Sequence, residues 1–350
     1  MSERFVGRAW RRGRAAVALL SLSLVAVAGC GSSDEGQPAP SASDSARHLS
    51  IGYIPGASLA PAFIAEQLGC LDGLNLTLEF QVIQNPADAI ALLSTKKLDA
   101  YVGSPFAGMF NQVARGTEVK LVASLGSVNT PGDEPAASGL YGGPHINSVE
   151  DLRGKRVGVL GSIGTATSYL LGKSLAEGGL TFADVELVSL SLPDMVPALK
   201  NGGIDGALLV APYTQQVIDQ GAGHALVDSK KAYGTDTTSA IVYGESLLVD
   251  DRDAGVRYLK AVACAAEQMQ GDWRTNETVV KALAEFLQVP EGAISGGGLY
   301  AFDPTLVVNE RTLIEMQEMF MAVEGTLTYS EILPPEKLID DSIRAEAVGG

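Results

Sequence analysis

The stretch Arg156–Glu177, RVGVLGSIGTATSYLLGKSLAE, has the pattern of a strand, a polar loop and a helix. Its first five residues are mostly apolar and β-branched, its loop is rich in Gly, Ser and Thr, and its remainder predicts a helix over Thr165–Glu177. Another strand (185–190), helix (194–201) and strand (204–210) follow. Strands that alternate with helices predict a parallel sheet flanked by helices, which is an α/β fold class.

The same order of elements occurs upstream at a constant offset of 106 residues. Ile51-Gly52 matches Val157-Gly158, and Leu98-Asp99 matches Ile204-Asp205. Chance similarity of two βαβ units explains shared element types, but explains a constant offset less easily. The repeat therefore predicts two α/β lobes with a cleft between them, and it gives Asp99 and Asp205 a structural role at strand starts.

Composition limits the possible functions. The 350 residues are 46% hydrophobic and 19% charged, which excludes disorder over most of the length. A formal net charge of −16 argues against nucleic acid as a partner, because phosphate binding needs a basic surface. Three Cys and three His are too few for a zinc cluster or a disulfide-dense scaffold.

The N-terminal residues 1–30 resemble a lipoprotein signal. Five Arg precede the uncharged run Ala15–Ala28, whose 14 residues fall short of the roughly 20 that a membrane span needs. Val27-Ala28-Gly29-Cys30 then resembles a lipobox, so we expect lipidation of Cys30; the alternative is an ordinary signal peptide with an incidental Cys. Residues 31–47 are rich in Ser, Pro, Gly and Asp and predict a flexible tether, so the folded part should begin near Leu49.

Polar residues follow three of the predicted strands. In α/β sheets ligands bind at the carboxyl ends of strands, next to helix N-termini. Ser104-Pro105 predicts a helix start with Ser104 as N-cap and Pro105 at N1, Gly161–Ser168 is a hydroxyl-rich loop, and Val210–Tyr213 ends a strand. Backbone N–H groups and hydroxyls there suit an anionic or polar ligand, although ordinary helix capping explains the same residues.

Aromatic residues near these strand ends are open to two interpretations, because they can stack on a flat ligand or simply belong to the core. They are Tyr53, Phe63, Phe106, Tyr169 and Tyr213. A further helix start is expected at Asp194, because Pro197 would then occupy N3, where no intrahelical N–H bond is lost.

Nothing in the sequence favours catalysis, a metal or a cofactor. His48, His145 and His224 have no visible nucleophilic partner, and the Gly-rich loop matches neither of the common nucleotide-binding motifs. Outside the cytoplasm Cys70 and Cys264 have two possible states, a disulfide or a buried free thiol at Cys264.

The residues resemble the nitrate/sulfonate/taurine-type solute-binding proteins of ABC importers, which include binders of thiamine precursors. The resemblance covers about residues 49–340. Its motifs are Ala60–Ala65 followed by Gly69 and Gly73-Leu74, Lys97–Ala100, Ile146–Val159 (INSVEDLRGKRVGV), and Asp205–Ala207 with Ala211-Pro212-Tyr213. Where many relatives have Trp-Glu-Pro-Tyr, this chain has Val210-Ala211-Pro212-Tyr213, which leaves the identity of the ligand open.

The resemblance implies a type II periplasmic-binding-protein fold. Lobe 1 would comprise residues 48–140 and 238–350, lobe 2 residues 141–237, and the crossovers would lie near 137–145 and 238–248. Ligand contacts are implied at loops after the strands: Tyr53, Pro55, Ser58, Ser104, Pro105, Ser162, Gly164, Thr165 and Tyr213.

The implied role is a lipid-anchored, extracytoplasmic receptor that is not an enzyme. It would capture a small organic solute, either an anion or a heterocycle, and deliver it to an ABC permease with its ATPase. Two alternatives stay open: an enzyme related to thiamine-precursor synthases, and a surface sensor without a transporter. The sparse cations in the candidate loops tilt the expected ligand toward a neutral or zwitterionic solute.

Overall fold

The computed structural model describes residues 46–130 and 136–349. The predicted signal, Cys30 and nearly all of the predicted tether lie outside these residues. The first strand, β1 (Arg47–Tyr53), begins two residues before the expected start of the fold. No helix in the described part of the chain is both long and apolar enough to cross a membrane.

The first sheet has the strand order β2-β1-β3-β11-β4. The central strand β1 is parallel to β2 (Leu76–Val82) and β3 (Ala100–Gly103), whereas β11 (Ala240–Gly244) is antiparallel to β3 and to β4 (Val119–Ser124). Helices of this part are α1 (Ala60–Ile64), α2 (Pro86–Ser94) and α3 (Ala107–Ala114). The parallel core that the alternating pattern predicted is confirmed.

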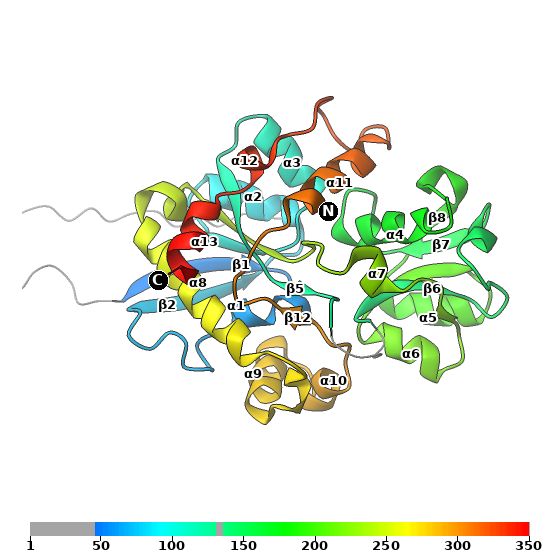
Figure 1. The fold of residues 1–350 in the computed structure, drawn as a ribbon, viewed down its shortest axis with the longest axis horizontal. Helices are drawn as coiled ribbons and strands as arrows, with labels where there is room; N and C mark the ends of the chain where they lie inside the picture. The colour runs from blue at the N-terminus through cyan, green and yellow to red at the C-terminus, as the bar shows by residue number, and fades with distance from the viewer. Residues whose placement is uncertain (1–45, 131–135, 350) are drawn as a thin grey trace, which may run out of the picture. The chain divides into compact units, whose positions relative to one another are not determined.

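The second sheet has the order β10-β6-β9-β7-β8 (Figure 1). Its strands are β6 (Ser138–Gly142), β7 (Arg156–Val159), β8 (Glu186–Ser189), β9 (Gly206–Val210) and β10 (His224–Ala225). Its helices are α4 (Ala166–Ala176), α5 (Leu192–Lys200), α6 (Tyr213–Asp219) and α7 (Ser229–Tyr233). All of β6 belongs to this sheet, so the division expected after residue 140 falls inside a strand.

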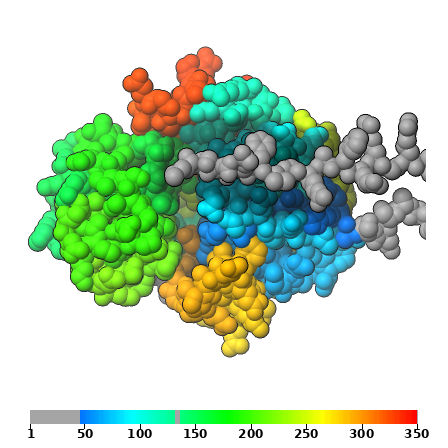
Figure 2. All heavy atoms as spheres, turned by 180° about the vertical axis from the view of Figure 1, so that it is seen from behind, coloured from blue at the N-terminus to red at the C-terminus, as the bar shows by residue number. Residues whose placement is uncertain are grey.

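The chain returns to the first sheet after the second is complete. Figure 2 shows the segment of the second sheet (green) gathered in one body, from which β11 leads back into the first sheet. Helices α8 (Arg252–Gln268), α12 (Pro335–Leu338) and α13 (Asp341–Val348) pack on that sheet's strands or on α1. The remaining C-terminal elements are α9 (Glu277–Leu287), α10 (Glu291–Ser295), α11 (Glu310–Met321), and β12 (Ala301–Phe302), which pairs with β5 (Gly126–Ser127).

The 106-residue repeat is confirmed by strand register. Ile51 pairs with Ala100 between β1 and β3, and Val157 pairs with Gly206 between β7 and β9, so both partners shift by the same offset. The bounds of α2 and α5 differ by that offset as well. The carboxylate of Asp99 accepts a hydrogen bond from Ser50 N (2.9 Å), and Asp205 accepts one from Arg156 N (3.0 Å), which confirms their structural role.

Two predicted helix starts are wrong. Helix α3 begins at Ala107 with Phe106 as its N-cap, so Ser104 and Pro105 belong to the preceding loop. Helix α5 begins at Leu192 after Ser191, which places Pro197 in its interior. The prediction placed Pro197 in the first turn to avoid losing a backbone hydrogen bond, but burial of the apolar face of α5 outweighs that single bond.

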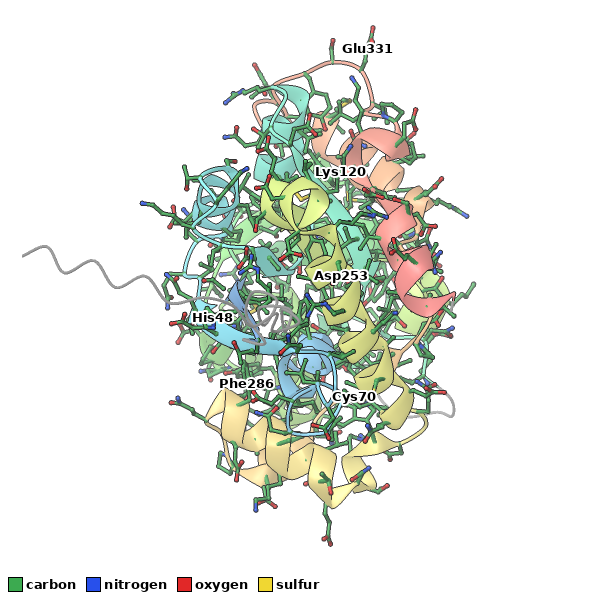
Figure 3. All side chains as sticks on the ribbon, turned by 90° about the vertical axis from the view of Figure 1, so that its left-hand side faces the viewer. His48, Cys70, Lys120, Asp253, Phe286 and Glu331 are labelled. Atoms are coloured by element: carbon green, nitrogen blue, oxygen red, sulfur yellow. A yellow bond between two sulfur atoms is a disulfide. The ribbon has the colours of Figure 1, made fainter. Side chains whose placement is uncertain are left out.

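A disulfide joins Cys70, in the turn after α1, to Cys264 on α8, and decides between the two states that the sequence left open. Cys70 is labelled in Figure 3. The two Cα atoms are 5.8 Å apart, although 194 residues separate the cysteines in sequence. The bond therefore ties the C-terminal helices to the beginning of the fold.

We predict that removing this disulfide lowers the free energy of unfolding by about 4 kcal/mol, because the bond closes a long loop in the unfolded chain. Urea unfolding of the oxidised protein, with and without reductant, measures the effect. The double variant Cys70→Ala/Cys264→Ala should resemble the reduced protein and be indifferent to reductant. An unfolding midpoint that reduction leaves unchanged would contradict the prediction.

Candidate functional site

The candidate site lies where loops leave the carboxyl ends of the strands. The Ser104-Pro105 loop follows β3, and the Gly161–Thr165 loop follows β7. The two loops meet, because Ala107 N, at the start of α3, donates a hydrogen bond to Gly164 O (2.8 Å). Loops at equivalent edges of the two sheets are thus brought together, and Gly164 and Pro105 are both buried at this meeting point.

Helix capping already engages the Thr165 hydroxyl and the backbone N–H groups of Gly164 and Thr165. Thr165 Oγ1 accepts from Ser168 N (3.2 Å), while Ser168 Oγ accepts from Gly164 N and Thr165 N (3.0 Å each). Ser162 is exposed, and its carbonyl accepts from Thr165 Oγ1 (3.3 Å). The loop is therefore a preformed turn, and among its side chains Ser162 is the most open to solvent.

Tyr53 and Ser58 lie in packed surroundings. Tyr53 is 9% exposed, and its ring contacts the rings of Phe63, Phe80 and Phe286, with centroids 5.0, 5.8 and 5.1 Å away. Burial raises the pKa of the Tyr53 hydroxyl. Figure 3 shows Phe286 on α9, so this aromatic cluster connects β1 to the C-terminal helices. Ser58 is half-buried beside Gly126, and Pro55 is exposed.

The other aromatic candidates divide between core and half-buried positions. Phe63 and Tyr169 are fully buried, whereas Phe106 is half-buried. Tyr213 is half-buried as the first residue of α6, directly after the cis peptide bond between Ala211 and Pro212. The structure thus places Tyr213 at the carboxyl end of β9, as the position after the strand predicted.

Tyr101, which no sequence motif singles out, carries a buried polar group at the same edge. Within the described residues, its hydroxyl is a buried side-chain atom that donates a hydrogen bond to no acceptor, although the backbone N–H of Ser104 lies close to its oxygen. The ring lies across Gly103, where an added Cβ would come within 2.2 Å of the hydroxyl oxygen, just before Ser104. Burial raises the pKa of this hydroxyl, so it stays a neutral donor. The sequence signal that could have found it is a tyrosine two residues before the end of a predicted strand, next to a polar loop.

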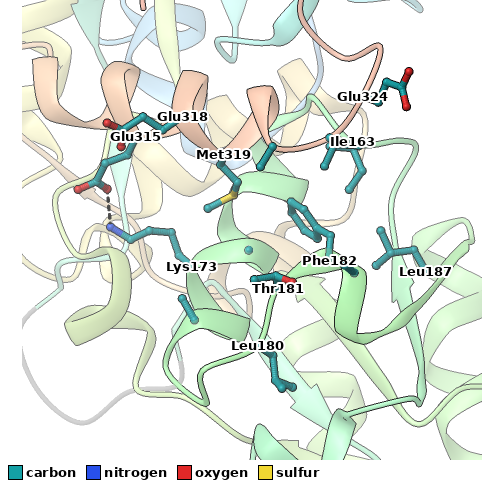
Figure 4. A pocket seen from close by; sticks show the side chains of 15 residues that line it. Ile163, Lys173, Leu180, Thr181, Phe182, Leu187, Glu315, Glu318, Met319 and Glu324 are labelled. Carbon is teal, nitrogen blue, oxygen red and sulfur yellow. Dashed lines mark hydrogen bonds and ion pairs between the residues drawn. The ribbon is translucent and has the colours of Figure 1, made fainter.

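A second polar cluster joins α4 to α11. Tyr169 Oη lies 2.8 Å from Asp236 Oδ2 and 3.0 Å from Glu315 Oε2, and Lys173 Nζ lies 3.3 and 2.8 Å from the same two oxygens. Arg311 also pairs with Glu315. Figure 4 shows the contact between Lys173 and Glu315. No sequence pattern predicts the Lys173–Glu315 pair, because the two residues are 142 positions apart.

The histidines lie elsewhere. His145 lies beside Lys155 and Asp205, at the starts of β7 and β9, which is the opposite edge from the candidate loops. His48 contacts Glu79 on β2. Across residues 46–130 and 136–349, no three His, Cys, Asp or Glu side chains are grouped to hold a metal ion.

Solved structures of binding proteins share this fold. The nitrate-binding protein NrtA from Synechocystis PCC 6803 matches with a TM-score of 0.64 and 16% identity, covering 87% of this chain and 89% of that one. The desulfurization enzyme DSZB also matches, with a TM-score of 0.58 and 16% identity, covering 87% and 99%. The chain therefore has the α/β fold of type II periplasmic binding proteins, a fold that enzymes share.

Residues 42–284 match the model of the NMT1-like family, and the chain belongs to that family. Among curated proteins, the taurine-binding periplasmic protein of Escherichia coli K12 is 30% identical over 160 residues, which cover 43% of this chain and 48% of that protein. The chain spans less than half the length of the curated relatives that it matches.

We predict that Gly164→Ala destabilises the fold by about 1–2 kcal/mol more than Gly161→Ala. Both glycines have positive φ (103° and 75°), so both variants strain the backbone. Only at Gly164 would a new Cβ also approach Ala107 Cβ, to 2.8 Å, whereas nothing lies within 4 Å at Gly161. Urea unfolding of the two variants measures the difference, and equal losses would contradict the close approach.

We predict that Glu315 stabilises the fold at neutral pH. Burial alone would raise its pKa, but hydrogen bonds from Lys173, Arg311 and Tyr169 outweigh burial and lower it. A lowered pKa in the folded state gives stability that is present above the unfolded-state pKa of about 4.3 and is lost as pH falls through the folded-state value.

Glu315→Gln should therefore lose about 1–3 kcal/mol at pH 7 and show a shallower decline in stability below about pH 4.5. Unfolding curves across this pH range, with the exposed Glu318→Gln on the same helix as the control, test the effect. If the Glu315 and Glu318 variants decline in parallel with the wild type, the prediction fails.

Proposed function

We propose that this chain is the extracytoplasmic solute-binding component of an ABC importer, anchored through Cys30, and that it is not an enzyme. The meeting of two polar loops from equivalent edges of the two sheets, through Ala107 N and Gly164 O, carries the proposal. Family membership and the fold shared with NrtA support it. The solute would be held between these loops, and a permease with its ATPase would receive it.

The proposed contacts are the residues of the strand-end loops. Ser104 and Ser162 would supply hydrogen bonds, and Gly164, Thr165, Pro105 and Tyr213 would lie beside them. Tyr53, Pro55 and Ser58 would border the same space from the end of β1. Binding would favour the closed arrangement of the two lobes over an open one, because the solute contacts both only when they meet.

The charges of this region favour a small zwitterionic or neutral solute. The segments 104–109 and 161–168 contain no Lys or Arg, so a bare anion would depend on N–H groups and hydroxyls alone. The formal net charge of −16 adds long-range repulsion, which salt screens beyond about 8 Å. The similarity to a taurine-binding protein points the same way, because taurine carries both charges.

Tyr101 supplies a sharp test. Its hydroxyl donates to no acceptor in the described structure, so a solute oxygen that reached it would supply the missing acceptor. We predict that Tyr101→Phe leaves the thermal stability of the solute-free protein unchanged or raised but weakens solute binding about tenfold.

Mass spectrometry first identifies any solute that co-purifies with the protein. Calorimetry with taurine, nitrate and a thiamine-precursor pyrimidine then measures which class of solute binds. Tyr243→Phe on β11 is the matched control: it removes a hydroxyl that donates to Gly255 O (2.9 Å), so it should lower stability and leave binding unchanged. Binding by none of these solutes, no co-purified solute and no compaction in small-angle scattering would together contradict the proposal. Turnover of a bound solute would replace it with the enzyme alternative.

A further inference from the structure

A cavity of about 800 Å³ lies between α4, the turn Phe182–Asp184, β8 and α11 (Figure 4). This volume falls within the range of small-molecule sites, about 300–1,000 Å³. None of the nine proposed solute contacts lines it, and only Ile163 belongs to the Gly161–Thr165 loop. The cavity is therefore distinct from the candidate site described above.

The walls of the cavity are mostly apolar. Phe182 and Met319 lie close together on its wall in Figure 4, and Leu187 on β8 lines it as well. Gly172 makes this approach possible, because a Cβ there would lie 2.2 Å from Met319 Sδ and 2.9 Å from Phe182 Cζ. A flexible thioether over a glycine can adapt to differently shaped occupants.

The charged groups around the cavity are predominantly acidic. Among the described residues that line it, Lys173 alone is basic, and Glu315 and Asp236 already balance that ammonium at 2.8 and 3.3 Å. Glu318 and Glu324 are exposed at the cavity and add two more carboxylates. An apolar molecule that carries an ammonium group is complementary to this lining, whereas one that carries a carboxylate meets repulsion.

We infer that this cavity is a second binding site, for a small molecule with an apolar body and a single ammonium group. Its walls come from both α4 and α11, so an occupant contacts the two helices that the Lys173–Glu315 pair already joins. Occupation therefore stabilises the contact between these helices, and it does so whether or not a solute is held at the strand-end loops.

The charge preference is tested with 4-phenylbutylamine and 4-phenylbutyrate, which share an apolar body and differ in charge. Protein labelled with ¹³C in the methionine methyl groups reports binding at Met319, whose signal is identified by its loss in Met319→Leu. The amine should shift this signal saturably at millimolar concentration, and the carboxylate should bind at least about tenfold more weakly. Equal affinities, or no shift with the amine, overturn the proposal.

Two pairs of variants locate the binding. Ala176→Trp fills the cavity from an exposed position and should abolish the Met319 shift, whereas Glu177→Trp, on the next residue outside the lining, should not. Glu318→Gln combined with Glu324→Gln should weaken amine binding about threefold to tenfold, and Glu177→Gln should leave it unchanged. Unchanged binding in Ala176→Trp overturns the assignment. Solute binding at the strand-end loops should survive this variant, so failure here is distinct from failure of the proposed function.

Discussion

In each sheet an aspartate directly before one strand accepts, through its carboxylate, a hydrogen bond from the backbone of the neighbouring parallel strand. Asp99 binds Ser50 N at 2.9 Å and Asp205 binds Arg156 N at 3.0 Å, and the backbone N–H of each aspartate returns a bond of 2.8 Å to the same neighbour's carbonyl. The paired bonds fix the register, and a slip by one residue would turn every side chain to the other face. Within each sheet the paired parallel strands consequently end at the same edge, and the polar loops that follow them lie together there.

The two carboxylates are not equivalent in their surroundings. Asp99 is 8% exposed and also contacts Arg47 and Ser246, which follows β11, whereas Asp205 has a more exposed side chain and pairs with Arg156 at 3.6 Å. The first copy of the repeat therefore holds the returning chain in addition to its own strands. The disulfide makes a second tie between the N-terminal elements and α8. The first sheet thus depends on distant segments, and the second is assembled mainly from its own.

Sequence patterns predicted what local periodicity encodes. The strands, the repeat and the role of Asp99 and Asp205 could be inferred, because each recurs at a fixed spacing. The starts of α3 and α5 could not, because burial of a helix face overrides capping preferences and the cost of Pro197. The sequence could not decide whether Cys70 and Cys264 form a disulfide, and it gave no indication of the Lys173–Glu315 pair. In both cases the partners lie more than a hundred residues apart, so packing between distant segments determines the contact.

Helix α4 connects these features. Its entry loop receives the hydrogen bond from Ala107 N, and Tyr169 and Lys173 hold α11 further along. Seven residues separate Ala166 from Lys173, which is about 10 Å of helix. Two attachments at that spacing resist rotation of the helix more strongly than either alone, since a turn about one contact must break the other. The two attachments therefore fix α4 both at its N-terminal loop and at the cavity that Lys173 lines.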